Sequence, residues 1–207
     1  MGRSTWLARK RVSGPIAARI SMRISNHVRI ETERLVLRVF TSSDLDYYLA
    51  LSSDADTFLF SERGPLSSEE AWTRLLRHVG HWGLLGYGLF AVEEKESGRF
   101  VGEAGLGDFR RQLGAGFDGV PEASWSMTRW ARGRGYATEA AKAALNWLEQ
   151  EQAVDRTVCL IHRDNKASLN VARKLGYGVY DECVYRGYPA LLHQRHAGGS
   201  SARRQEP

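Results

Sequence analysis

The stretch Arg129-Trp-Ala-Arg-Gly-Arg-Gly-Tyr-Ala-Thr-Glu139 lies between a run typical of a strand and a run typical of a helix. Gly133 and Gly135 allow the backbone to approach a ligand closely, and the first turn of a following helix presents unpaired N–H groups with a partial positive charge. Arg132 and Arg134 add cationic charge. The stretch therefore predicts an anion site, and a pyrophosphate is its natural occupant.

Two common phosphate motifs do not match this stretch. A Walker loop needs Gly-x-x-x-x-Gly-Lys-Ser/Thr, and the dinucleotide fingerprint Gly-x-Gly-x-x-Gly fails at its third glycine, where Thr138 stands. Thr138 can instead cap the helix or bind a phosphate oxygen. Taken alone, a Gly-x-Gly turn before a helix is also compatible with a purely structural turn.

The sequence on both sides predicts an α/β (α+β) fold. Alternating apolar residues predict strands, while helical spacing and a capping box at Ser67 and Glu70 predict helices. We expect strands at 31–40, 87–93, 100–109, 122–128, 157–162, 178–185 and 190–195, and helices beginning near Leu45 and Ser67 and covering 138–150 and 166–175. The order is βααβββαβαββ. Because the crossover across 122–162 needs a parallel neighbour, we expect a mixed, mostly antiparallel twisted sheet flanked by helices.

Charge is distributed unevenly along the 207 residues. The net charge is +5, but residues 1–30 hold seven basic and no acidic residues, which leaves residues 31–207 at −2. We expect 1–30 to be a basic extension, either disordered or part of a misassigned start before Met22. Residues 31–197 are expected to form a single domain, and 198–207 a disordered tail.

This composition excludes several classes of partner. The acidic balance of the expected domain argues against a specific nucleic-acid partner. No apolar window is long enough to cross a membrane. We therefore expect a cytoplasmic protein, as a monomer or a homodimer.

Three segments together resemble the GCN5-related N-acetyltransferase (GNAT) superfamily. Arg132-x-x-Gly135-x-Ala137 is similar to its Gln/Arg-x-x-Gly-x-Gly/Ala motif, and Asn165 to Tyr177 is similar to its Asn-x-x-Ser/Ala…Leu/Phe-Gly-Phe/Tyr segment. Thr32-Glu-Arg-Leu-Val-Leu-Arg38 resembles the opening of the branch that contains the ribosomal-protein N-terminal acetyltransferases, of the RimJ/RimL type.

The resemblance implies a coenzyme A site. The pyrophosphate would bind the segment formed by Arg132, Gly133, Arg134, Gly135, Tyr136, Ala137 and Thr138. The strands at 122–128 and 157–162 would splay apart to admit the pantetheine arm. Main-chain groups near Ser126 and Met127 would bind this arm and polarise the thioester carbonyl. Asn165 and Ser168 would line the same cleft.

The resemblance also implies transfer of an acetyl group from acetyl-CoA to a primary amine, by direct attack in a ternary complex. For the base, Glu122 is slightly preferred to Glu103 on the neighbouring strand, although a strand-end carboxylate is as readily a salt-bridge partner. The tyrosine acid that many relatives use is replaced by Ala172, and Ser168 is the candidate substitute. A serine near a helix start is also a common capping group.

Other chemistry-bearing residues have structural interpretations. His78 and His81 stand three residues apart without a third ligand in sequence, so no metal site is predicted. Cys159 and Cys183 fall in strand-like runs, and we interpret both as buried small apolar residues. His162 is interpreted as a strand-end hydrogen-bonding residue.

The acceptor stays open at this point. It is either a protein N-terminal α-amino group or a small-molecule amine, and residues 58–66 and 110–121 are expected to wall its site. The alternative is a coenzyme-A-binding sensor or accessory protein without turnover, which the alanine at position 172 motivates.

Overall fold

The computed structural model describes residues 28–54 and 65–198. In these ranges the chain forms, in order, β1 (Arg29–Glu31), β2 (Leu35–Val39), the 3-10 helix η1 (Ser42–Asp44), α1 (Leu45–Ser53), α2 (Ser68–Leu85), β3 (Leu89–Glu94), β4 (Phe100–Gly107), β5 (Glu122–Met127), the 3-10 helix η3 (Arg129–Ala131), α3 (Tyr136–Gln152), β6 (Arg156–His162), α4 (Lys166–Lys174), β7 (Gly178–Tyr185) and β8 (Tyr188–His196). No helix among them has the length and apolar character needed to span a bilayer.

The predicted fold class is confirmed, and the predicted order needs one addition. The three-residue strand β1 precedes β2 and pairs with it, from Arg29 opposite Arg38 to Glu31 opposite Val36. Such a short strand has no periodicity that a sequence pattern could reveal. The sheet therefore already includes residues 29 and 30, which the sequence analysis placed in the basic extension.

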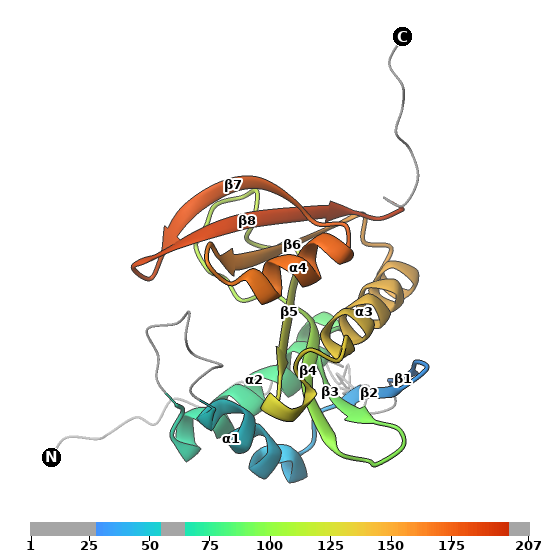
Figure 1. Ribbon diagram of the computed structural model, residues 1–207. Helices are drawn as coiled ribbons and strands as arrows, with labels where there is room; N and C mark the ends of the chain where they lie inside the picture. Colours follow the sequence, from blue (N-terminus) through green and yellow to red (C-terminus); the bar gives the residue numbers. More distant parts are fainter. Residues whose placement is uncertain (1–27, 55–64, 199–207) are drawn as a thin grey trace, which may run out of the picture.

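The eight strands form one sheet in the order β1-β2-β3-β4-β5-β6-β8-β7. Every neighbouring pair is antiparallel except β5 and β6, which are parallel. The parallel pair is the one connected through α3, as a strand, helix, strand crossover requires. Figure 1 shows β6, β7 and β8 on one side of this junction and β1 to β4 on the other.

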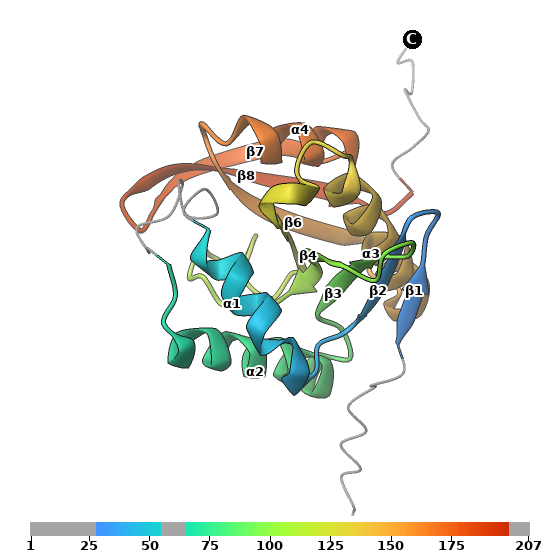
Figure 2. The same cartoon turned by 60° about the horizontal axis from the view of Figure 1, so that its bottom comes forward.

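The helices cover the sheet on both faces. Alternate side chains of the strands pack against α3 in the larger core, which includes Leu37, Phe90 and Leu148. The other face of β3 and β4 packs against α1 and α2, with Leu75 and Ala91 in the shared core. Figures 1 and 2 show α1 and α2 together, apart from α3.

Helix α2 begins and ends as its sequence predicts. Ser67 Oγ accepts a hydrogen bond from the Glu70 amide, and the Glu70 carboxylate accepts one from the Ser67 amide, which completes the capping box. Gly86 ends the helix in the left-handed conformation at φ +74°.

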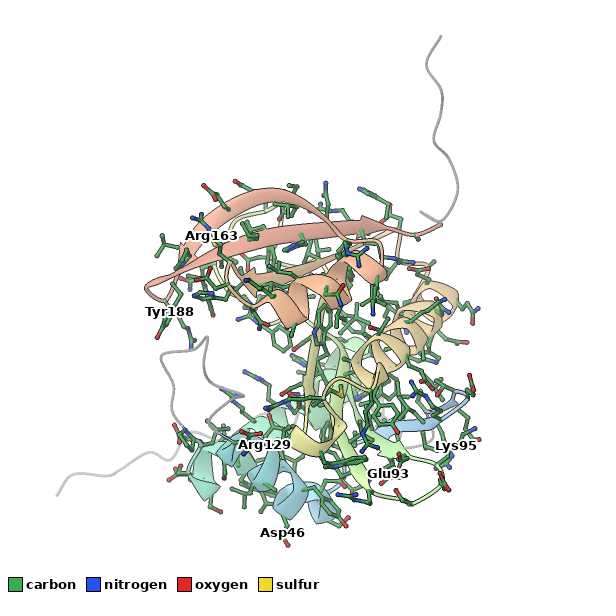
Figure 3. All side chains as sticks on the ribbon, in the orientation of Figure 1. Asp46, Glu93, Lys95, Arg129, Arg163 and Tyr188 are labelled. Carbon is green, nitrogen blue, oxygen red and sulfur yellow. The ribbon has the colours of Figure 1, made fainter. Side chains whose placement is uncertain are left out.

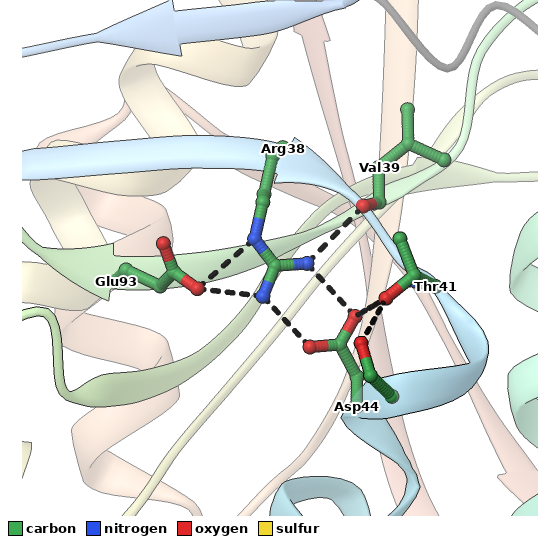
Figure 4. Close-up of polar contacts among 6 residues, drawn as sticks. Arg38, Val39, Thr41, Asp44 and Glu93 are labelled. Carbon is green, nitrogen blue, oxygen red and sulfur yellow. Dashed lines mark hydrogen bonds and ion pairs between the residues drawn. The ribbon is translucent and has the colours of Figure 1, made fainter.

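An ion-pair cluster joins this helical layer to the sheet. Arg38 of β2 forms two hydrogen bonds with the Asp44 carboxylate, at 2.7 and 2.8 Å, and two with Glu93 of β3 (Figure 4). Asp44 also accepts the Thr41 amide at 2.7 Å. The Arg38 guanidinium lowers the pKa of the Asp44 carboxyl, against the effect of burial. The cluster therefore fixes the start of α1 relative to β2 and β3.

Candidate functional site

Strands β5 and β6 are neighbours over one residue pair alone. Glu122 is opposite Val158, and the Val158 amide donates to Pro121 O at 3.0 Å. Beyond that pair the two strands of the described structure separate, and Figure 1 shows β5 running away from β6 at a steep angle. The sheet is thus open along one edge of β5, from residue 123 to Met127.

The main-chain groups of β5 alternate between this open edge and β4. The Thr128 amide donates to Val101 O of β4, and Ser126 O lies against Gly102 of β4. Because successive residues direct their N–H and C=O groups to opposite edges of a strand, those of Trp125 and Met127 face the divergence. Met127 O there accepts a hydrogen bond from Arg132 Nε at 3.1 Å. The side chain of Ser126 lies beside Glu103, its partner on β4.

The chain then enters the predicted anion loop. Gly133 and Gly135 have φ values of +77° and +83°, in the left-handed region where a side chain is strained. No heavy atom lies within 4 Å of a Cβ built at Gly133. Gly135 is the N-cap of α3, and no side chain caps this helix start. The first amides of α3 therefore have no side-chain cap and could bind an anionic ligand, while the predicted pyrophosphate site stays a prediction.

The two arginines of the loop make contacts within the protein. Arg132 Nη2 lies 2.9 Å from Asp54 Oδ2, in addition to its bond with Met127 O. The Arg134 guanidinium lies over the Trp130 ring, 5.5 Å from its centroid. Arg132 therefore ties the loop to the end of α1 and to β5. The Arg132 amide also donates to Arg129 O, at 3.4 Å, and the predicted role of Arg132 toward coenzyme A stays a prediction.

Figure 3 shows the two sides of the site. Arg129, at the start of the loop, lies near the C-terminal end of β5, while Arg163 and Tyr188 lie with β6 to β8 on the far side of the divergence. The Arg163 amide donates to Pro189 O at 3.1 Å, which joins the end of β6 to β8.

Residues near the N-terminus brace the loop and the start of α3, a contact that the sequence analysis did not anticipate. Arg34 Nη1 donates to Arg134 O at 3.0 Å, and Arg34 Nε donates to Glu139 Oε2 at 2.8 Å. Thr32 Oγ1 donates to Glu139 Oε1 at 2.6 Å. Thr32 and Arg34 belong to the opening motif Thr32 to Arg38, which is the sequence feature that could have pointed to these contacts. The opening motif therefore stabilises the cofactor loop through contacts between residues about 100 positions apart in the chain.

Asn165 and Ser168 lie at the start of α4, directly after β6. Asn165 Oδ1 accepts the Ser168 amide at 3.0 Å, so Asn165 is the cap of this helix. The Ser168 hydroxyl is half-buried and has no hydrogen-bond partner among the described residues. His162, at the end of β6, accepts the Asp164 amide at its Nδ1, 3.0 Å away, as expected of a strand-end hydrogen-bonding residue.

Glu122 is buried at the closed end of the divergence, with 3% of its surface exposed. Arg111 Nε donates to both carboxylate oxygens, at 2.9 and 2.6 Å, and Arg111 Nη1 donates to Tyr185 Oη at 3.1 Å. Burial raises the pKa of Glu122, and Arg111 opposes that rise. The salt-bridge interpretation of this carboxylate is thus correct.

Glu103 occupies a different place. It lies four residues before Gly107, the partner of Glu122, which corresponds to about 13 Å of extended strand. Its Oε2 is 3.3 Å from Nε2 of His78. The two candidate bases therefore flank different parts of β5.

The loop after β4 covers one face of the second half of the sheet. Phe117 is buried with Val158 and Leu192 in a third core cluster. Of the other predicted wall, 58–66, only Pro65 and Leu66 lie within the described residues. Leu66 packs against the core of α1 and α2, and its amide donates to Ser52 O at 3.1 Å.

The remaining candidate residues show no metal centre. Within 28–54 and 65–198, no group of three or more histidine, cysteine or acidic side chains could hold a metal ion. Cys159 is buried, and burial raises the pKa of its thiol. Cys183 is only half-buried, because its strand β7 lies at the edge of the sheet, so the expected full burial is wrong there.

Comparison with known proteins identifies this architecture. Residues 34–178 match the model of the acetyltransferase (GNAT) domain. A putative GnaT-family acetyltransferase from Bordetella pertussis is 33% identical, with a TM-score of 0.74, over 81% of this chain and 99% of that one. RimL, a ribosomal L7/L12 alpha-N-protein acetyltransferase solved in complex with coenzyme A, has a TM-score of 0.65 at 16% identity, over 82% and 98% of the two chains.

The family match covers well over half of the sequence. The chain therefore belongs to the GNAT acetyltransferase family and is an acyltransferase that uses acetyl-CoA. Among curated proteins, it is 36% identical to the uncharacterized protein YkkB of Bacillus subtilis over 93 residues, which are 44% of this chain and 52% of that protein. The chain thus matches about half the length of that relative.

Proposed function

We propose that this protein transfers the acetyl group of acetyl-CoA to a primary amine, by direct attack in a ternary complex. The observation that carries the proposal is the divergence of β5 and β6 next to an uncapped helix start. This arrangement offers an open strand edge and an anion site, which suit the two chemically different halves of coenzyme A.

The residues that would hold coenzyme A belong to two groups. The amides at the start of α3, with Gly133 and Gly135 in their left-handed conformations, suit the pyrophosphate. Main-chain groups at Trp125 and Met127 face the open edge of β5 and suit the amide-bearing pantetheine arm. Bound acetyl-CoA supplies an activated thioester, and the amine supplies the nucleophile.

The base is one of the two carboxylates that the sequence suggested. Both oxygens of Glu122 accept hydrogen bonds from Arg111, which reduces its capacity to take a proton. Glu103 has no arginine bonded to its carboxylate among the described residues; its Oε2 is buried 3.3 Å from His78 Nε2, and Glu103 lies opposite Ser126. These contacts favour Glu103 over Glu122, the reverse of the preference from sequence.

Ser168 is the proposed donor of a proton to the departing sulfur. Its hydroxyl has no other hydrogen-bond partner among the described residues. Ala172, at the place of the usual tyrosine, is fully buried in the core and offers no proton. A thiolate is a good leaving group, so we expect Ser168→Ala to reduce the rate by about tenfold at most.

The acceptor is a protein N-terminal α-amino group or a small-molecule amine. The likeness to RimL, named for a ribosomal protein acceptor, supports the first class. Loop 110–121, which packs on β6 and β8, and Arg111 beside Tyr185 of β7 would form one wall of the acceptor site.

The alternative is a coenzyme-A-binding sensor or accessory protein without turnover. The observation in its favour is the buried alanine at position 172, where many relatives have a tyrosine that acts as the acid; an alanine side chain cannot donate a proton. A sensor would bind coenzyme A as tightly as an enzyme but would release no free thiol from acetyl-CoA.

One experiment separates these functions. The protein is incubated with acetyl-CoA and a mixed pool of peptides and small amines, and the products are analysed by mass spectrometry. We expect at least one amine to gain an acetyl group, together with release of coenzyme A thiol. Tight coenzyme A binding in calorimetry without any acetylated product would contradict the enzyme and support the sensor.

A further inference from the structure

Two arginines from different elements lie over the same aromatic ring. Arg77 Cζ, on α2, is 5.4 Å from the centroid of the Phe109 ring, and Arg111 Cζ, in the loop after β4, is 5.1 Å from it. Phe109 also makes an edge contact with the buried His81 of α2, with ring centroids 5.6 Å apart. Two like charges therefore meet at one ring, on the side of the sheet that α2 covers.

The Arg111 guanidinium is held in one orientation. Its Nε donates to both oxygens of Glu122, its Nη1 donates to Tyr185 Oη at 3.1 Å, and the Tyr185 ring lies 5.1 Å from its Cζ. Its Nη2 has no hydrogen-bond partner among the described residues, and 23% of the side chain is exposed. Arg111 therefore keeps N–H groups in a fixed plane for a further acceptor.

Arg77 is a cation without a carboxylate partner. Its side chain is exposed and forms no ion pair within the described part of the chain. The protein on its flanks lowers the pKa of its guanidinium by desolvation, and the charges of Arg74 and Arg111 lower it further. The charge of Glu103 opposes this effect from outside ion-pair distance. An anion held between Arg77 and Arg111 would offset their repulsion.

Strand β5 presents small side chains beside this pair of arginines. Glu122, which binds Arg111, points to the same face of β5 as Ser124 and Ser126, because successive side chains of a strand alternate. Both serines are half-buried. They are about 7 Å apart along the strand. An anion at the arginines and an amine near Ser126 would therefore belong to one small molecule or to one end of a peptide.

We propose that Arg77 and Arg111 bind an oxyanion of the acceptor, a carboxylate or a phosphate, so that the enzyme prefers primary amines with a negative group a few bonds from the nitrogen. The proposal rests on the N-acetyltransferase function proposed above and adds a substrate class to it. Arg77 supplies the charge without a partner, and Arg111 supplies the fixed N–H groups. Guanidinium groups bind both kinds of oxyanion through two parallel hydrogen bonds.

Binding is tested first without turnover. Each charged amine has a neutral counterpart: O-phosphoethanolamine with ethanolamine, γ-aminobutyrate with butylamine, and a dipeptide amide beginning with aspartate with one beginning with asparagine. Each is titrated into the complex with coenzyme A while NMR follows the arginine Nε–H signals. We expect the Arg77 and Arg111 signals to move with the charged member of at least one pair. In Arg77→Gln the affinity for that amine should fall about tenfold, as expected for one charge-assisted hydrogen bond.

The same pairs are then compared as acceptors. The wild-type kcat/KM is expected to be at least about tenfold higher for the charged member of the preferred pair, which also distinguishes carboxylate from phosphate. Arg77→Gln should lower this ratio about tenfold, and Arg77→Lys should keep part of it, because lysine retains the charge and loses the planar donors. Arg29→Gln is the control, because this exposed arginine lies in β1, at the far edge of the sheet, and its change should leave the ratio as it is.

The outcomes separate this inference from the function on which it rests. Equal kcat/KM within every pair, with acetylated products present, would overturn the oxyanion site and leave the acetyltransferase function standing. A wild-type preference that Arg77→Gln keeps would overturn the assignment to these arginines. Movement of the Arg77 and Arg111 signals with the charged amines, without any acetylated product, would support the oxyanion site and contradict the proposed turnover.

Discussion

At the scale of single residues, the cofactor loop depends on backbone conformation. Gly135 combines a positive φ with the N-cap position of α3, so its lack of a side chain serves both the turn and the approach of a ligand. Gly133 has a similar φ and open space around it. Conformation, and not crowding, is thus the reason for glycine at Gly133.

We expect Gly135→Ala to weaken acetyl-CoA binding and to destabilise the protein. An alanine at φ +83° costs about 1 to 2 kcal/mol of strain, and its Cβ would lie 3.4 Å from Arg34 Nη2. The KM for acetyl-CoA and the unfolding midpoint measure the two effects. Gly80→Ala is the control, because this site inside α2 has open space and should gain about 0.5 to 1 kcal/mol. Equal behaviour of the two variants would contradict the argument.

The Glu122 and Arg111 pair is expected to make stability depend on pH. Arg111→Gln leaves Glu122 buried without its ion pair, which should lower the free energy of unfolding by about 3 kcal/mol near pH 7. Burial already raises the pKa of Glu122, and the substitution removes the main opposing influence. Between the unfolded and folded pKa values the native state binds more protons, so the stability of the variant rises as the pH falls.

Urea unfolding at about pH 5 and about pH 8 measures this dependence. The free energies of unfolding of wild type and Arg111→Gln should differ less at the lower pH. Protonated Glu122 is neutral, so losing the Arg111 cation destabilises the folded protein less. Tyr185→Phe removes the other partner of Arg111 and should cost about 1 kcal/mol at either pH. A pH-independent loss in Arg111→Gln would show that Glu122 is not the titrating group.

At the scale of elements, α3 is positioned by a segment far from it in sequence. Arg34, between β1 and β2, bonds both the loop carbonyl of Arg134 and the Glu139 carboxylate in the first turn of α3. The Tyr136 hydroxyl donates to Glu94 at the end of β3. An acid in the first turn also suits the helix dipole. The start of α3 is therefore anchored to β2 and β3, independently of any ligand.

Arg34→Gln is expected to loosen this anchor. The change removes the ion pair with Glu139, in which the arginine side chain is 42% exposed and the glutamate side chain 19% exposed, and should cost about 1 kcal/mol. The KM for acetyl-CoA should rise several-fold while kcat stays close to wild type. Arg29→Gln breaks an ion pair whose two side chains are 54% exposed, so it should change stability by less than about 0.5 kcal/mol. A matching loss in both would contradict the anchoring role.

At the scale of the whole molecule, β5 connects two parts of the sheet. Its contact with β6 is the single pair at Glu122, whereas β6 pairs with β8 along its whole length. A ligand that bridges the open edge would therefore add contacts between parts that share few main-chain hydrogen bonds. Residues 125–127 and 133–138 belong to the segments that would gain protection.

We expect coenzyme A to stabilise the protein and to slow amide hydrogen exchange at these segments. At about 100 times the dissociation constant, the stabilisation is about 2.7 kcal/mol. Exchange measured by mass spectrometry should slow at 125–127 and 133–138, while β7, the far edge strand, should change little. Protection confined to β7 and α4 would place the ligand elsewhere.

Much of the fold follows from local patterns in the sequence. Alternation predicted β2, and a capping box predicted the start of α2, because each of these depends on residues close together in the chain. The family motifs, which are also local, predicted in addition that the ligand is coenzyme A. The short strand β1 was not predicted, because three residues are too few to show an alternating pattern.

The sequence by itself determined the fold class, the order of the elements after β1, and the acetyltransferase family, because short-range spacing encodes them. The tertiary structure decided which groups meet: Arg34 with Glu139, Arg111 with Glu122, and His78 with Glu103. These partners are 11 to 105 residues apart. Their contacts depend on the packing of helices on the sheet and on the separation of β5 from β6, and no local pattern encodes either.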